Sequence, residues 1–115
     1  MNLNPNHNTI NLRVKGGNRI FNIEEILYFT TFDCHNAKIY LVSGDNYTVK
    51  QNLKSINCKL HKSKFIKCNA SYLVNFMYIK EFNKRKVVLS NKKEIKISIK
   101  NSKIVNELIS EYSGN

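Results

Sequence analysis

Short runs of alternating apolar and polar residues are the feature that most constrains what this chain can fold into. Residues 10–15, INLRVK, form one such run, and the pair Gly16–Gly17 follows it directly. A period of two places the apolar side chains on one face of a β-strand. Glycine adopts the positive φ that a tight hairpin turn requires. We therefore expect a β-hairpin here, with one face on a core and one in water.

The same pattern recurs along the rest of the chain. Apolar-alternating or β-branched and aromatic runs predict further strands at residues 26–32, 38–42, 47–50, 64–68, 72–74, 78–82, 86–90 and 94–98. Polar segments separate them, among them DCHNA at 33–37 and SGDN at 43–46. The fold class predicted is mostly β, with small antiparallel sheets and one or two short helices.

Two segments carry helical spacing instead. Leu53, Ile56 and Leu60 recur at helical intervals, which leaves Lys54 and Lys59 facing solvent. The second helix is expected over residues 101–112, capped by Asn101 or Ser102. Its predicted apolar stripe consists of Ile104, Val105, Leu108, Ile109 and Tyr112. A helix-turn-helix is disfavoured, because neither helix follows a partner helix across a tight turn.

The length of 115 residues predicts one domain, over residues 10–115. The polar residues 1–9 are expected to form a disordered tail or a linker remnant, and they lack the basic and apolar parts of a signal peptide. No apolar run approaches the length that spans a bilayer. The three cysteines are odd in number and show no CxxC spacing, which favours reduced thiols and a cytoplasmic protein without membrane association.

Charge is the strongest compositional signal. The formal net charge is +11, and no acidic residue occurs between Asp45 and Glu81. That window carries Lys50, Lys54, Lys59, Lys62, Lys64, Lys67 and Lys80. AT-rich codons also favour lysine, but the clustering points to a polyanionic partner, either nucleic acid or an acidic membrane surface.

Catalytic motifs are absent from the sequence. There is no GxSxG, P-loop or HExxH, and the three histidines, His7, His35 and His61, are scattered. We therefore expect no enzymatic activity, no catalytic residue, no metal site, no cofactor and no small-molecule substrate.

One region carries a family resemblance. The segment FIKCNASYLVN at 65–75, a later IKISIKNSKIV at 95–105 and an earlier IEEILYFTTFDCHNAKIYL at 23–41 occur in this order. Together they resemble the LytTR-type DNA-binding domain of bacterial transcription regulators, which is the output domain of many response regulators. The matching positions are Phe65, Ile66, Lys67, Ser71, Tyr72, Val74, Asn75, Ile79, Ile95, Ile97, Ser98 and Lys100.

The resemblance implies a LytTR-like assembly of small antiparallel sheets that inserts loops, rather than a recognition helix, into successive major grooves of DNA. The implied DNA-binding residues lie in three loops: His35, Asn36 and Lys38; then Lys67, Asn69 and Ser71; then Ser98, Lys100, Asn101 and Lys103. On this interpretation the strand breaks at residues 69–71 because that segment leaves the sheet to meet DNA. The alternative for each residue is an ordinary polar turn or a solvated charge.

The sequence also departs from the family pattern. Asn69 stands where the family has histidine, and Lys67 stands where it usually has arginine. A lysine still neutralises a phosphate, but it cannot form the two parallel hydrogen bonds that an arginine makes. Ala70 cannot donate a hydrogen bond, but its methyl group can contact a thymine. These changes predict either a different target sequence or more reliance on charge and DNA shape.

The predicted function is sequence-specific binding of double-stranded DNA by a transcription regulator, with a second protomer expected on repeated half-sites. The alternative is a basic β module for RNA or single strands, with stacking platforms at Tyr28, Phe29, Phe32, Tyr40 and Tyr47. The alternating positions of those aromatics favour a core role instead. A third hypothesis, protein interaction through the terminal helix at 103–112, is disfavoured because that helix is expected to pack on the sheet.

Overall fold

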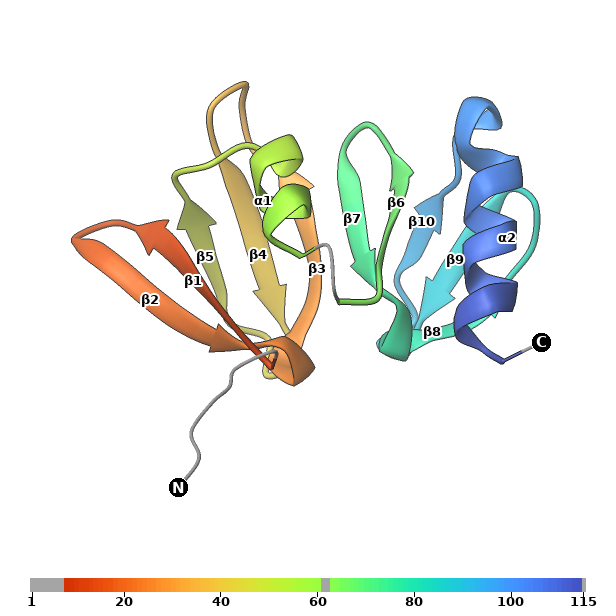
Figure 1. Cartoon of the computed structure of the whole chain (residues 1–115), viewed down its shortest axis with the longest axis horizontal. Coiled ribbons are helices and arrows are strands. Elements are labelled where there is room, and N and C mark those ends of the chain that lie inside the picture. Colours follow the sequence, from red (N-terminus) through yellow and green to blue (C-terminus); the bar gives the residue numbers. More distant parts are fainter. Residues whose placement is uncertain (1–7, 61–62, 115) are drawn as a thin grey trace.

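A computed structural model describes residues 8–60 and 63–114 (Figure 1). Its strands are β1 (Thr9–Val14), β2 (Gly17–Asn22), β3 (Ile26–Thr31), β4 (Ala37–Leu41), β5 (Asn46–Val49), β6 (Phe65–Asn69), β7 (Tyr72–Asn75), β8 (Ile79–Phe82), β9 (Lys86–Leu89) and β10 (Glu94–Lys96). The helices are α1 (Leu53–Lys59) and α2 (Ser102–Tyr112), and the 3-10 turns are η1 (Ile23–Glu25), η2 (Phe76–Tyr78) and η3 (Ile99–Asn101). The predicted mostly-β class is confirmed. Residues 1–7 of the expected tail lie outside the described residues, and Thr9 already belongs to β1.

The strands form two antiparallel sheets within the described part of the chain. The larger has the order β2-β1-β5-β4-β3-β7-β6, and the smaller has the order β10-β9-β8. The predicted first hairpin is present: Val14 pairs with Gly17, and Gly16 in the turn has a φ of 88°. A single register pair, Val14 with Val49, joins this hairpin to β5. The hairpin is otherwise held by apolar packing, since Ile10, Leu12 and Phe21 belong to the same core cluster as the α1 side chains.

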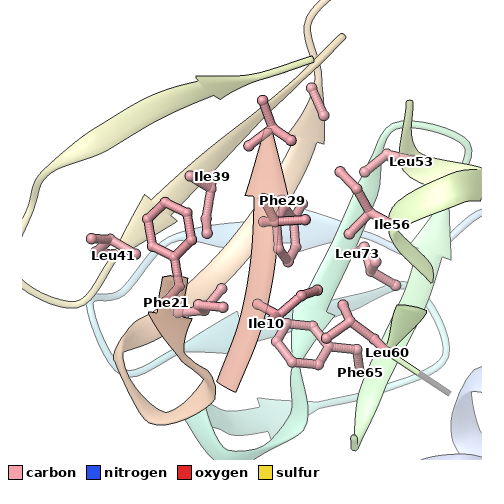
Figure 2. Packing of buried hydrophobic residues seen from close by; sticks show 14 residues of the cluster. Ile10, Phe21, Phe29, Ile39, Leu41, Leu53, Ile56, Leu60, Phe65 and Leu73 are labelled. Atoms are coloured by element: carbon pink, nitrogen blue, oxygen red, sulfur yellow. The ribbon is translucent and has the colours of Figure 1, made fainter. Parts of the chain in front are cut away.

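Strand β3 lies between β4 and β7 in the large sheet and is buried on both faces along its first four residues. On one face Phe29 packs in a cluster with the β1–β2 hairpin and α1. Figure 2 shows the apolar side chains of α1 and of Leu60, which follows it, directed at those of β3, β6 and β7: Leu53, Ile56 and Leu60 against Phe29, Phe65 and Leu73. On the other face Tyr28 packs in a second cluster with the small sheet and α2. Strand β3 therefore contributes to both apolar clusters and joins the two halves of the molecule.

One buried polar side chain lies at this junction. Asn75, 3% exposed, donates from Nδ2 to the Ile23 oxygen at 3.1 Å and to the Ile26 oxygen at 2.8 Å. Its Oδ1 accepts from the Met77 nitrogen at 3.1 Å, which shapes η2. The turn η2 was not expected from the sequence, where residues 78–82 were predicted as a single strand.

Two details differ from the predictions near the carboxyl end. Strand β10 ends at Lys96 rather than at Ser98, because the Ile97 nitrogen donates to the Arg85 oxygen and the Ser98 nitrogen to the Cys68 oxygen. The chain thus leaves the small sheet and crosses to β6. In α2 the expectation that Ile104 is buried is wrong, since it is 53% exposed. The buried face is narrower and centres on Val105 and Ile109.

None of the helices in the described ranges is both long enough and apolar enough to cross a membrane.

Candidate nucleic-acid interface

Three connections lie along one edge of the molecule, at the top of Figure 1. They are the β3–β4 loop at 32–36, the β6–β7 turn at 70–71 and the β10–α2 connection at 97–101, which contains η3. These are the segments in which the sequence predicts DNA contacts. Their strands run toward this edge from both sheets, so residues from distant parts of the sequence share one surface.

Backbone and side-chain hydrogen bonds join the three connections. The Thr31 nitrogen at the end of β3 donates to the Ser71 oxygen at 2.9 Å. On the other side, Asn69 Nδ2 donates to the Lys96 oxygen at 2.6 Å, and Asn101 Nδ2 donates to the Lys67 oxygen at 3.2 Å. The β6–β7 hairpin is therefore fixed on both flanks, and the edge is preorganised.

The β3–β4 loop is built around Asp33. Its carboxylate accepts from the backbone nitrogens of His35 and Asn36, both at 2.8 Å, and from Asn36 Nδ2 at 3.0 Å. The Asn36 side-chain hydrogen bond, followed by the His35 backbone hydrogen bond, lowers the pKa of Asp33. Asn36 thus shapes the loop, whereas the exposed His35 projects from it. Of the three predicted contact residues of this loop, His35 is the exposed one.

Lys38 also reaches this edge, from the beginning of β4. Its Nζ lies 5.7 Å from the centroid of the Phe32 ring, and that ring is 57% exposed. A cation over an aromatic face keeps its charge and gains a modest attraction. Lys38 is accordingly a half-buried but oriented positive charge.

The second and third predicted groups share one surface hollow. It is lined by Lys67, Ala70, Ser98, Lys100 and Asn101. Lys67 and Lys100 are exposed and supply two positive charges, while the exposed Ala70 supplies a methyl group. The hollow therefore combines groups that suit phosphate with a small apolar surface.

Besides Asn36, three more predicted contact residues make side-chain hydrogen bonds inside the protein. Besides its bond to Lys96, Asn69 accepts from the Ser71 nitrogen at 2.8 Å through Oδ1. Ser98 Oγ accepts from the Asn101 nitrogen at 3.2 Å and so caps η3. The predicted capping of α2 by the Asn101 side chain is not formed, because that side chain is bonded to Lys67 instead. These residues position the loops, while Ser71 is exposed at the turn.

Lys103 lies on the α2 flank of η3, away from the hollow of Lys67. It lines a neighbouring hollow together with Lys84, Ile99, Ser102, Asn106 and Glu107. Lys84 and Arg85 were not among the predicted contact residues. They reach this flank because the Ile97 nitrogen donates to the Arg85 oxygen at 2.7 Å and Ser102 Oγ donates to the Lys84 oxygen at 2.9 Å. The basic sequence NKRK at 83–86 indicates a candidate phosphate-binding turn, but its place beside η3 depends on hydrogen bonds to residues far along the chain.

The aromatic residues considered as stacking platforms are mostly inside. Tyr28 and Phe29 are buried, Tyr40 and Tyr47 are half-buried, and Phe32 alone of these five is exposed. The hypothesis of an aromatic platform for single strands therefore loses four of its five members. The described residues also contain no cluster of three or more histidine, cysteine or acidic side chains arranged for a metal ion.

Comparison with known families agrees with this geometry. The profile of the LytTr DNA-binding domain matches residues 16–110, which includes all three connections. The chain belongs to the LytTR DNA-binding domain family. This is a DNA-binding family rather than a catalytic one, and its domains are typical output domains of response regulators.

A solved structure supports the fold of this LytTR domain. It is described as the LytTr DNA-binding domain of a methyl-accepting/DNA response regulator from Bacillus cereus. It is 18% identical in sequence, with a TM-score of 0.72, covering 89% of this chain and 96% of that one. A search of curated protein sequences returned no significant match.

Proposed function

We propose that this LytTR domain binds double-stranded DNA sequence-specifically through its three strand-connecting loops, as a cytoplasmic bacterial transcription regulator or as the output domain of a response regulator. The observation that carries the proposal is the gathering of three hydrogen-bonded loops on one edge. Lysines from separate segments project there, and the chain has a net charge of +11. Base-reading groups need such a rigid support.

Binding begins with electrostatic capture and ends with base readout. Lys38, Lys67, Lys100 and Lys103 attract the phosphates, a sequence-independent contribution that weakens as salt rises. His35 in the first loop and Ser71 in the second are exposed and able to bond base edges. Asn36, Asn69, Ser98 and Asn101 act chiefly by holding the backbone of these loops. The predicted contact residues thus divide into those that bind phosphates, those that read bases and those that position the loops.

Selection of bound duplexes from a random pool at moderate salt tests the proposal directly. We expect one enriched motif, and a gel-shift titration should then show tighter binding to that motif than to a scrambled duplex. Loss of all enrichment over repeated rounds would contradict sequence-specific binding. Two copies of the motif at a fixed spacing would support a second protomer on repeated half-sites, because one small module covers little DNA.

Lys100 provides a test of the third loop. If it contacts a base, Lys100→Ala should weaken binding to the selected duplex by about 1–3 kcal/mol while leaving nonspecific binding almost unchanged. An equal loss on the selected and scrambled duplexes would identify Lys100 as a phosphate contact. No loss on either duplex would remove it from the interface.

Binding of RNA or single strands is the second candidate, and only Phe32 now favours it. A competition assay separates the two functions. The labelled duplex should be displaced by unlabelled duplex, and much less by either separated strand or by RNA of the same sequence. A Phe32→Leu variant that loses single-strand binding but keeps duplex binding would confine stacking to that ring.

A further inference from the structure

Ile99 is the most exposed of the large apolar residues in the described part of the chain, with 97% of its surface accessible to solvent. It lies in η3, between Ser98 and Lys100, at the edge formed by the three loops. Exposed apolar surface on this scale adds nothing to folding, because its burial is what stabilises a core. The other isoleucines of this segment, Ile95 and Ile97, are buried.

The position of Ile99 is fixed rather than loose. The Asn101 nitrogen donates to both the Ser98 backbone oxygen, at 3.0 Å, and Ser98 Oγ, at 3.2 Å, which closes the turn around Ile99. On its far side, the Ser102 hydroxyl is bonded to the Lys84 oxygen. The isoleucine is therefore presented outward by a turn that is anchored at both ends.

Positive charge surrounds this apolar side chain. Ile99 borders one hollow with Lys84, Arg85 and Lys96, and a second with Lys84 and Lys103. Lys100 follows it in sequence and lines the hollow of the β6–β7 turn. Among the described residues, the first hollow has no acidic residue in its lining, and the second has one, Glu107. An apolar partner protein would have to desolvate five cations here, whereas DNA pairs with them and still offers an apolar group, the thymine C5-methyl.

We propose that Ile99 is a specificity-determining residue that contacts thymine methyl groups in the major groove, while the surrounding lysines and Arg85 bind the flanking phosphates. The inference rests on the proposed function and deepens it, since it names a base that the site selects. It also gives the third loop a means of base readout that does not depend on hydrogen bonds, which suits a loop whose Ser98 and Asn101 side chains are engaged within the protein.

The experiment uses the duplex selected from the random pool and measures affinity by gel-shift titration. Ile99→Ala should weaken binding to this duplex about three- to tenfold, because most of the apolar contact is removed. Replacing each thymine in turn by uracil deletes only the methyl group. At the contacted position the wild-type domain should lose about fourfold in affinity, the value expected for one buried carbon.

The two changes are then combined. If Ile99 meets that methyl group, the Ile99→Ala domain should bind the thymine and uracil duplexes equally well. Ile20→Ala is the matched control, since Ile20 is an isoleucine 66% exposed on β2, away from the three loops. It should bind all duplexes like the wild type.

The outcomes separate the inference from the function beneath it. Wild-type binding without any sequence preference would overturn both. A specific wild-type complex that is insensitive to Ile99→Ala would overturn the inference and leave the proposed function standing. An Ile99→Ala domain that keeps the full preference for thymine over uracil would do the same, as would tight self-association of the wild-type domain that the substitution abolishes without changing DNA affinity.

Discussion

At the scale of single residues, Asn75 joins the two halves of the molecule. Its amide satisfies two carbonyl groups of the η1 region and one backbone nitrogen of η2. Asn75→Ala leaves these buried groups without their partner, so we expect a loss of about 2–3 kcal/mol in the free energy of unfolding. Urea denaturation measures it. Asn57→Ala, on the exposed side of α1, is the control and should change stability by less than about 0.5 kcal/mol.

Cys68 is buried in the second cluster, and its burial raises the pKa of the thiol to about 12. The thiol of the unfolded chain ionises near pH 9. The stability that the buried, neutral thiol contributes is therefore fully present below pH 9 and is lost as the pH rises from about 9 toward 12. The thiolate is the reactive form, so Cys68 should resist a thiol reagent at pH 8 while the exposed Cys34 reacts. Labelling followed by mass spectrometry distinguishes them. Equal rates at both sites in the folded protein would contradict the burial argument.

At the scale of elements, the β6–β7 hairpin is held by Asn69 on one side and by Thr31 on the other. If Asn69 is a positioning residue, Asn69→Ala should cost about 1 kcal/mol of stability and increase hydrogen exchange in the β10–α2 connection. Ser71→Ala, at the exposed turn, should do neither. An Asn69→Ala domain with unchanged stability and exchange but weaker DNA binding would make Asn69 a direct contact instead.

Most elements could be predicted because their signals are local. Alternation over 10–15, the paired glycines and the spacing of Leu53, Ile56 and Leu60 each specify an element within a few residues. The wrong predictions concern segments whose conformation is set by hydrogen bonds to residues far away in the sequence. Continued alternation through Ile95, Ile97 and Ile99 is typical of one strand, yet pairing of Ser98 with Cys68 turns the chain and leaves Ile99 outside.

The candidate site divides in the same way. The three loops could be identified from the sequence because family motifs mark them. The roles within them could not, since whether Asn69 or Asn101 faces DNA depends on carbonyl groups 27 and 34 residues away. Lys84 and Arg85 were missed for the same reason: a meander and α2 bring them to the edge.

At the scale of the whole molecule, the basic edge acts as one electrostatic surface supported by both sheets. Each phosphate neutralised releases counterions, so the logarithm of the binding constant should fall linearly with the logarithm of salt concentration, with a slope near −0.9 per contact. Lys67 lines the shared hollow, where we propose that it contacts a phosphate, so Lys67→Ala should make that slope shallower by about 1 on every duplex sequence. The slope is measured by binding titrations at salt concentrations from about 50 to about 200 mM, a range over which the affinity of such contacts falls steeply.

Lys80→Ala is the control for that slope. Lys80 carries the same charge and is exposed on β8, the strand at the bottom of Figure 1, whereas the three loops lie at the top. Long-range attraction from Lys80 is screened within about 8 Å at physiological ionic strength, so its removal should leave the slope unchanged. Equal effects of the two substitutions would mean that DNA responds to the total charge of +11 rather than to a localised edge. A selective effect of Lys67 requires that the duplex lie across the β6–β7 turn, between the β3–β4 loop and η3.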